Sequence, residues 1–446
     1  MLPIDFLLTP FYLFIASFVV ILLRKRLTDK TIRKYYLPAF AVKVVGAISI
    51  GLIYHFYYGY GDTLRYHWYA TFISEKMWSD PVTGLRMLFV DLNNIPPDLW
   101  VEFRNVKFIT DKGTFLIVRI TAFLSFFCYQ SYYAVAVLYA TLSFSGAWLL
   151  FKAFYKLYPS LHKPLALATL FVPSIFFWGS GILKDSITLS ALGWLFYAFV
   201  TFKEKKVRNT IIIIFSCWLI ISIKLYILLM FVVALLIWYA AEFHHKLRHP
   251  MLRVLVIPIL LFVVSVALFF SIRELGEINT RFAIENVSDS AEKLAKTQLQ
   301  LSEDMKGSAY SLGSDPLDYS LKGAITKLPA ALNVTLFRPY IWEVKNPVMV
   351  MAALESLIIL VFTLKVFRRR GLIGFFKFGK HTLVVFCLVY AFTFGAAVGM
   401  TSYNFGTLVR YKIPCIPFYL AALIIINKIG AAEKLKKKKK LELQVK

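Results

Sequence analysis

Long apolar segments follow one another along most of the chain, and they constrain the fold more than any other feature. A helix needs roughly 20 apolar residues to cross a bilayer, and in lipid only a helix or a closed barrel satisfies its own backbone polar groups. Segments that approach this length lie at about 4–23, 37–58, 113–128, 131–153, 164–180, 184–202, 209–223, 225–241, 254–272, 347–367, 382–400 and 411–428. With 59% hydrophobic and 17% charged residues among 446, the chain is too apolar for a water-soluble fold. The sequence predicts an all-α, polytopic bundle of transmembrane helices that forms one integral membrane domain, residues 1–446.

The basic residues predict how the helices are oriented. The formal net charge is +26, but Lys and Arg occur in short runs just beyond apolar segments, which is typical of cytoplasmic loops. The runs lie at 24–26, 203–208, 244–248, 368–370 and 436–440. Placing all of them inside puts the N-terminus outside and the basic tail, 429–446, in the cytoplasm, which requires an odd number of crossings. We interpret the charge as a topology signal with membrane lipid as the partner, and not as a surface for nucleic acid.

One of these apolar segments must therefore fail to cross, and we choose 113–128. It is short and has Arg119 near its centre, where a charged side chain in a bilayer is costly. We expect an interfacial or re-entrant half-helix there, which leaves about eleven spans and two large outer loops. The first loop, 59–130 with the half-helix, mixes aromatic and charged residues as surface-lying amphipathic helices do. The second, 273–346, is charged and rich in Ser in its middle.

The sequence also excludes several kinds of chemistry. No His/Cys metal constellation, P-loop, Gly-x-Ser-x-Gly or His-Glu-x-x-His motif is present, so ATP-driven transport, serine hydrolysis and zinc proteolysis have no support. The four cysteines lie inside or at the edge of apolar segments without metal-ligand spacing, and we interpret them as small core residues.

Two outer-face stretches in the first half of the chain carry charged residues. In 58–66, two glycines allow a sharp turn before Asp62, which either caps the next helix or acts as a general base or substrate orienter. In 173–185, Lys184 and Asp185 open a span after a Gly-Ser-Gly turn, either as a local ion pair or as ligands of an anionic headgroup. Other residues of interest nearby are Arg65, Tyr66, His67, Arg119, Trp178 and Lys224.

Two further stretches lie in the second half. Arg338 and Glu343 precede a span and can simply pair, while Trp342 between them suits a membrane interface. Tyr403, Arg410 and Lys412 precede Pro414 in the last span, and for these residues snorkelling is the alternative to function.

Cations gathered on the outer face depart from the positive-inside pattern and imply an anion. They are Arg65, Arg119, Lys184, Arg338, Arg410 and Lys412. A headgroup anchored in the bilayer, such as a polyprenyl phosphate or diphosphate, would be held by Arg and Lys, which also stabilise a leaving phosphate. Nearby aromatic side chains offer stacking faces for sugar rings.

These stretches resemble the polytopic glycosyltransferases of the GT-C superfamily and the neighbouring O-antigen polymerase and ligase-like proteins of bacteria. The matching residues are Gly61-Asp62-Thr63 with Arg65-Tyr66, Val118-Arg119-Ile120, Pro173-Ser174 through Lys184-Asp185, and Arg410-Tyr411-Lys412-Ile413-Pro414. The resemblance implies a bacterial inner-membrane enzyme that moves sugar from a polyprenyl-linked donor to a glycan, lipid or protein acceptor at the periplasmic face. The acidic pair usual in GT-C enzymes is not present as Asp-x-Asp or Asp-Glu, so a divalent cation stays an open alternative and no metal ligand is assigned.

The expected site follows from this interpretation. We expect the catalytic residues to be Asp62, Lys184 and Asp185. We expect the residues that bind the lipid phosphate to be Arg65, Arg119, Arg338, Arg410 and Lys412. We expect the residues that bind the substrate to be Tyr66, His67, Trp178, Trp342, Glu343 and Tyr403.

Two other functions stay open. A transporter or flippase for a lipid-linked glycan would use the same cations, but it would often show internal repeats and paired broken helices, and the sequence reveals neither. A membrane scaffold subunit of a secretion or envelope-assembly complex would use the surface charges as contacts with its partners, and it would be lost when a partner is deleted.

Overall fold

The structure is a computed structural model that describes residues 3–106, 111–246, 310, 321–376, 381–402 and 404–444. These residues form helices joined by turns, with no β-strand among them, so the all-α prediction is confirmed for this part of the chain. The chain divides into two compact units, Met1–Leu225 and Tyr226–Lys446, and the single integral membrane domain stays a prediction. The predicted span 254–272, Tyr403 and most of the predicted loop 273–346 lie outside the described residues.

Six described helices are long and apolar enough to cross a membrane, which makes the chain a helical membrane protein. They are Pro3–Leu27, Arg33–Tyr58, Tyr132–Leu157, Lys206–Ala240, Pro347–Gly371 and Thr382–Met400. A bent pair, Phe405–Tyr411 and Ile416–Gly430, adds a seventh if it is counted as one span. The predicted total of about eleven stays a prediction.

The first unit is built around one central helix. Its elements are α1 (Pro3–Leu27), α2 (Arg33–Ile53), the π-helical turn η1 (Tyr54–Tyr58), α3 (Asp62–Ser79), α4 (Pro81–Phe89), α5 (Pro97–Trp100), η2 (Glu102–Asn105), α6 (Lys112–Phe127), α7 (Tyr132–Leu157), η3 (Pro159–Leu161), α8 (His162–Leu170), α9 (Pro173–Trp178), α10 (Lys184–Val200) and the beginning of α11 (Lys206–Lys246). Helix α7 packs against α1, α2, α8 and α10, so most of its span is buried inside the unit.

Small residues bring α7 and α10 into backbone contact. A Cβ atom on Gly146 of α7 would clash with the backbone of Ser190 in α10, and one on Gly193 would clash with the carbonyl of Gly146. Close approach at small residues is a common way for helices to pack in lipid, where no hydrophobic effect drives them together.

Two predicted spans are interrupted. Segment 164–180 is not one helix, because α8 ends at Leu170 and α9 starts at Pro173, whose ring cannot continue a helix from the preceding turn. Helix α11 contains one non-helical residue, Lys224, with φ −149° and ψ 73°. That break lies between the predicted spans 209–223 and 225–241.

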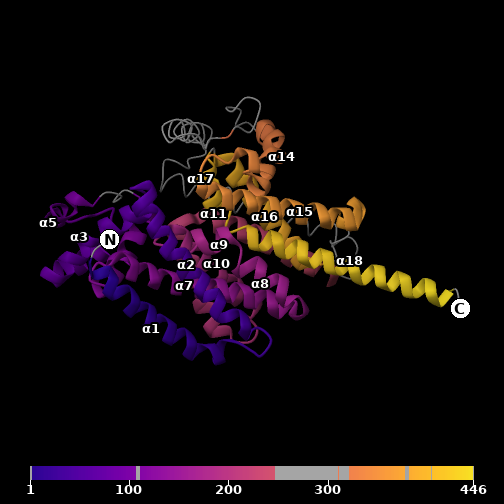
Figure 1. Cartoon of the computed structure of the whole chain (residues 1–446), viewed down its shortest axis with the longest axis horizontal. Coiled ribbons are helices and arrows are strands. Elements are labelled where there is room, and N and C mark those ends of the chain that lie inside the picture. The colour runs from indigo at the N-terminus through magenta and orange to yellow at the C-terminus, as the bar shows by residue number, and fades with distance from the viewer. Residues whose placement is uncertain are drawn as a thin grey trace. The chain divides into compact units, whose positions relative to one another are not determined.

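The second unit contains the rest of α11 together with α14 (Leu321–Phe337), η6 (Ile341–Glu343), α15 (Pro347–Phe376), α16 (Thr382–Thr401), α17 (Phe405–Tyr411) and α18 (Ile416–Gln444). Helix α16 packs against α14 and α18, and Phe231, Phe386, Tyr390 and Phe418 form an aromatic core between helices. Figure 1 shows α18 as one continuous helix near the C-terminus, so the predicted basic tail extends a helix as far as Gln444.

Candidate functional site

The turn before α3 positions Asp62 differently from the predicted cap. Gly61 occupies the N-cap position with a φ of 149°, and a Cβ atom there would clash with the ring of Tyr54. Asp62 is therefore the first residue of the helix, and the expectation that it caps the helix is wrong. Its carboxylate lies in the first turn, where the helix dipole favours a negative charge. Arg65 is exposed.

The next turn of α3 faces the protein interior. Tyr66 is buried, and the ring of His67 lies edge-on to that of Tyr132, with 5.3 Å between the ring centroids. The Nε2 atom of His67 is buried without a hydrogen-bond partner among the described residues. Burial lowers the pKa of His67 to about 4, despite the opposing charge of Asp5, so its imidazole is neutral near pH 7.

Four charged residues form a group that we call the α10 cluster: Asp111, Lys184, Asp185 and Lys224. Lys184 and Asp185 do not pair with each other. The Nζ atom of Lys184 lies 3.1 Å from Oδ2 of Asp111, and the Nζ atom of Lys224 lies 2.5 Å from Oδ1 of Asp185. The local ion pair predicted for these neighbours is thus replaced by two contacts with other parts of the chain.

Both pairs are fixed by secondary structure. Asp111 is the N-cap of α6, where its carboxylate accepts a hydrogen bond from the backbone N–H of Thr114. Burial raises the pKa of Asp111, but the charge of Lys184 and the hydrogen bonds of Thr114 together hold it below its usual value. Asp185 lies in the first turn of α10, and Lys224 is the non-helical residue of α11. The α10 cluster therefore joins two helix N-termini to a helix break.

Sequence reasoning missed Lys43, a buried cation in the middle of α2. Its side chain is 1% exposed and donates to Oγ of Ser143 at 2.9 Å and to the carbonyls of Ile175 at 3.0 Å and Gly179 at 2.9 Å. These three acceptors use all three donors of the ammonium group. Lys43 thus anchors the end of α9 and the turn that leads to α10. The signal that could have found it is a lone Lys inside an apolar segment.

Two other predicted residues contact carbonyl and aromatic groups of the first unit. The guanidinium of Arg119 donates to the carbonyl of Val90, and its Cζ atom lies 4.6 Å from the ring centroid of Phe115. The sequence predicts an anionic partner for Arg119. The structure gives it a carbonyl and an aromatic face, and burial lowers the pKa of Arg119 while the nearby charge of Asp91 opposes that shift. Trp178 is buried at the end of α9 against Phe177.

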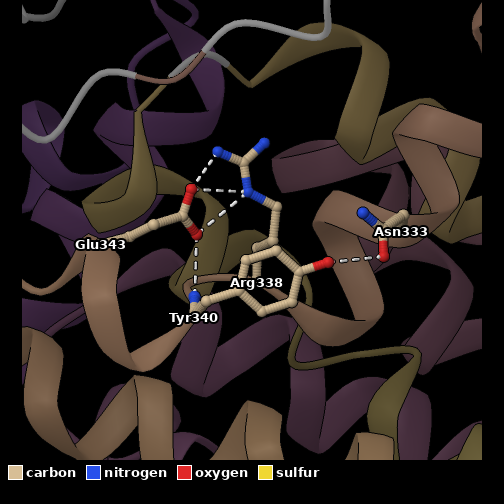
Figure 2. A network of polar contacts seen from close by, with 4 residues as sticks. All are labelled: Asn333, Arg338, Tyr340 and Glu343. Atoms are coloured by element: carbon tan, nitrogen blue, oxygen red, sulfur yellow. Dashed lines mark hydrogen bonds and ion pairs between the residues drawn. The ribbon is translucent and has the colours of Figure 1, made fainter.

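In the second unit, Asn333, Arg338, Tyr340, Trp342 and Glu343 form what we call the Arg338 cluster. The Nε atom of Arg338 donates to Oε1 and Oε2 of Glu343 at 3.0 and 3.1 Å, and Nη2 donates to Oε1 as well (Figure 2). The backbone N–H of Tyr340 donates to Oε2 of Glu343 at 2.8 Å, and the hydroxyl of Tyr340 donates to Asn333 at 3.1 Å. The pair that the sequence predicts between Arg338 and Glu343 is confirmed.

Aromatic rings surround this pair. The Cζ atom of Arg338 lies 5.2 Å from the ring centroids of both Tyr310 and Phe405. Trp342 is 81% exposed and stacks on Tyr340, with 4.8 Å between the ring centroids. The second terminal nitrogen of Arg338, Nη1, makes no hydrogen bond to another described residue. The cluster thus presents a guanidinium N–H beside an exposed aromatic stack.

The carboxylate of Glu343 is stabilised in its charged form. Burial raises the pKa of Glu343, but hydrogen bonds from Arg338 and from the backbone of Tyr340 outweigh burial and leave the pKa below its usual value. The positive and negative charges of Arg338 and Glu343 therefore compensate each other near neutral pH.

Lys412 lies behind the Arg338 cluster. It is 0% exposed, and its Nζ atom donates to the carbonyl of Arg338 at 3.1 Å and to Oγ of Ser356 at 3.0 Å. The snorkelling expectation is wrong for Lys412, because its charge points into the protein. Arg410 is half-buried in the last turn of α17.

The predicted site residues fall into two groups. Asp62, Arg65, Tyr66, His67, Arg119, Trp178, Lys184 and Asp185 belong to the first unit, and Arg338, Trp342, Glu343, Arg410 and Lys412 belong to the second. A constellation that joins both groups stays a prediction. Among the described residues, no three or more His, Cys, Asp or Glu side chains form a group that could hold a metal ion.

Comparisons with protein-family models, with curated proteins and with solved structures give no match to this chain. The site must therefore be interpreted from its own geometry, and the resemblance to GT-C enzymes stays a prediction.

Proposed function

We propose that this chain is a membrane glycosyltransferase or polysaccharide polymerase that uses a polyprenyl-phosphate-linked sugar at the periplasmic face of a bacterial inner membrane. The observation that carries the proposal is the Arg338 cluster. It combines an aromatic stack, in which Trp342 is exposed, with the charge-compensated pair of Arg338 and Glu343. Glu343 lies four residues before the helix Pro347–Gly371, which is apolar enough to cross a membrane.

The geometry of the cluster suits a sugar better than a phosphate. The rings of Trp342 and Tyr340 are stacked and inclined by 25°, so the outer face of the exposed Trp342 ring is left for the apolar face of a pyranose. Arg338 adds a donor and Glu343 an acceptor for sugar hydroxyls, the small set of polar groups that fixes orientation in a binding site. Because Glu343 neutralises Arg338, a phosphate would gain little from the Arg338 charge. We therefore reassign Arg338 from the lipid phosphate to the sugar.

The proposed reaction is glycosyl transfer. A hydroxyl oxygen of the acceptor attacks the anomeric carbon, the bond from that carbon to the phosphate oxygen breaks, and the polyprenyl phosphate or diphosphate leaves. Asp62 remains our proposed group for orienting the hydroxyl and taking its proton, since it is a half-buried carboxylate at the start of a helix outside the spans.

Binding and transfer by the full chain in lipid nanodiscs test this function. The probe is an undecaprenyl-diphosphate-linked hexose, with binding followed by native mass spectrometry and transfer followed by the mass of a glycosylated acceptor. We expect Trp342→Ala and Arg338→Ala to weaken probe binding by about tenfold or more, which corresponds to ~1.4 kcal/mol.

Matched controls come from the first unit. Trp100→Ala removes another exposed Trp, and Arg86→Ala removes an Arg from an exposed ion pair with Asp98. Both control variants should bind the probe like the wild type. The proposal is wrong if the two cluster variants do the same, or if sugar-free undecaprenyl diphosphate binds as tightly as the sugar-linked probe.

A transporter of lipid-linked glycans is the second candidate, and one observation favours it. Helices α17 and α18 form a bent pair with an angle of 64°, which is either a broken span or a re-entrant loop, and the sequence does not reveal it. Transporters often bind substrate at discontinuous helices. In proteoliposomes a transporter would move the labelled probe between leaflets without forming a new glycosidic bond, whereas a transferase would form that bond.

A further inference from the structure

The last apolar helix pair is interrupted at residues 412–415, a segment that begins with a buried lysine. Helix α17 ends at Tyr411 and α18 begins at Ile416, and Lys412 is the first residue after α17. A cation at such a break usually faces a polar cavity or a partner, because burial of a bare charge is costly. The partners of Lys412 therefore indicate what the break is connected to.

Those partners converge on the backbone of Arg338. The carbonyl oxygen of Arg338 accepts a hydrogen bond from Nζ of Lys412 at 3.1 Å and another from Oγ of Ser356 at 3.0 Å. Nζ of Lys412 also donates to Oγ of Ser356, which closes a triangle of contacts. Arg338 directly follows the last residue of α14, where helix carbonyls lack partners within the helix. A lysine at that end also complements the negative pole of the helix.

The charge of Lys412 is balanced inside the protein. Glu355, the neighbour of Ser356 in α15, is buried and interacts electrostatically with Lys412. This cation therefore has its own counter-charge and two hydrogen bonds in the interior, and it does not extend toward a lipid headgroup. The residue that the sequence assigns to the lipid phosphate is built into the support of Arg338.

We propose that Lys412 is a positioning residue that couples the break in the last span to the Arg338 cluster. A change in the bend between α17 and α18 displaces Lys412, and Lys412 is bonded to the same residue whose guanidinium holds Glu343 beside the Tyr340 and Trp342 stack. The position of the aromatic stack thus depends on the angle between α17 and α18. The importance of this coupling for sugar binding rests on the proposed function, while the coupling itself can be measured without substrate.

The test is ¹⁹F NMR on the full chain labelled with 5-fluorotryptophan, with the Trp342 resonance assigned by Trp342→Phe. We expect Lys412→Met to shift or broaden the Trp342 resonance and to leave that of Trp148, a buried residue of the first unit, unchanged. Ser356→Ala should shift the Trp342 resonance in the same direction by less, because Lys412 then still contacts the Arg338 carbonyl. Lys365→Met, which removes an exposed lysine of α15, is the matched control and should leave the Trp342 resonance unchanged.

The outcomes separate the coupling from the function. If Lys412→Met prevents insertion of the protein into the membrane, the shift of the Trp342 resonance in Ser356→Ala alone decides whether the coupling exists. The coupling is overturned if the Trp342 resonance is unchanged both in Ser356→Ala and in Lys412→Met that folds. This holds even if Trp342→Ala abolishes binding of the sugar-linked probe, because that result concerns the proposed function and not the coupling. If the Trp342 resonance shifts in these variants but the wild-type protein does not bind the sugar-linked probe, the coupling is supported and the proposed function is wrong.

Discussion

The α10 cluster and the Arg338 cluster place oppositely charged pairs at the start of a helix or just before one, yet they differ in what surrounds the charges. In the α10 cluster, Asp185 and Lys224 have side chains 1% and 9% exposed, and they join segments 39 residues apart. In the Arg338 cluster, the paired residues are five apart in sequence and half-buried, and they lie beside the exposed Trp342.

The difference separates a structural pair from a pair available to a ligand. Removing water from two charges is costly, and only close contact between them offsets that cost, so a buried ion pair holds the helices that carry it in one arrangement and leaves little surface for another molecule. The Arg338 pair keeps a guanidinium N–H without a partner among the described residues and an aromatic surface in reach of a ligand. The sequence predicts catalytic roles for Lys184 and Asp185. The burial of Asp185 against Lys224 favours the Arg338 cluster over Asp185 as a place where a ligand binds, whereas Lys184 and its partner Asp111 are partly exposed.

The largest expected effect is the loss of stability when the buried pair of Asp185 and Lys224 is broken. Asp185→Asn leaves the Lys224 charge buried without its counter-ion, which should lower the unfolding free energy by about 3–5 kcal/mol. The measurement is equilibrium unfolding in mixed micelles, with the double variant Asp185→Asn and Lys224→Met as the comparison. The double variant should recover part of the loss, and an Asp185→Asn protein as stable as the wild type would remove the structural role of the pair.

A second buried cation in the same unit should behave similarly but more weakly. Lys43→Met removes three hydrogen bonds and leaves the carbonyl of Ile175 without the Lys43 donor, which should cost about 2 kcal/mol of stability. Thermal unfolding measures this loss, with Lys365→Met as the exposed control. A destabilisation no larger than that of the control would show that Lys43 is dispensable for the packing of α9.

In the Arg338 cluster, the expected effect is on binding. Arg338→Lys cannot make the planar fork with Glu343, so the affinity for the undecaprenyl-diphosphate-linked hexose should fall about tenfold, or ~1.4 kcal/mol. The unfolding midpoint should change much less than in Asp185→Asn. A large loss of stability with unchanged affinity would reverse the assignment of roles to the two clusters.

The smallest effect is a pH dependence local to the Arg338 cluster. Burial raises the pKa of Glu343, but the hydrogen bonds from Arg338 and Tyr340 hold it below its usual value of roughly 4.3, so the folded state binds fewer protons than the unfolded state there. The resulting stabilisation is complete above that usual pKa and is lost as the pH falls through the folded value. The ¹⁹F resonance of Trp342 should report this transition below about pH 4.3, and Glu343→Gln should abolish it.

Helix positions followed from the sequence where apolar segments were long. The segments predicted at 4–23, 131–153, 347–367 and 382–400 are all helical in the structure and belong to candidate spans. The physical reason is general, because a long apolar segment in lipid must satisfy its backbone internally. Shorter segments were less predictable: 164–180 is divided at Pro173, and the last span is bent at Lys412.

The Arg338 and Glu343 pair was also predictable, because residues five apart around a turn are held near each other by the chain itself. The same local reasoning failed for Lys184, whose partner Asp111 is 73 residues away. It also failed for Lys43 and Lys412, whose acceptors are backbone carbonyls and hydroxyls on other elements.

The sequence by itself thus determined the helical class, the apolar segments and the local ion pair, since each depends on residues that are close along the chain. Only the tertiary structure decided which cation meets which acceptor, and whether a charge points into the protein or toward its surface. Those choices depend on how helices pack, and backbone contact at residues such as Gly146 and Ser190 is set by neighbours that the linear sequence does not bring together.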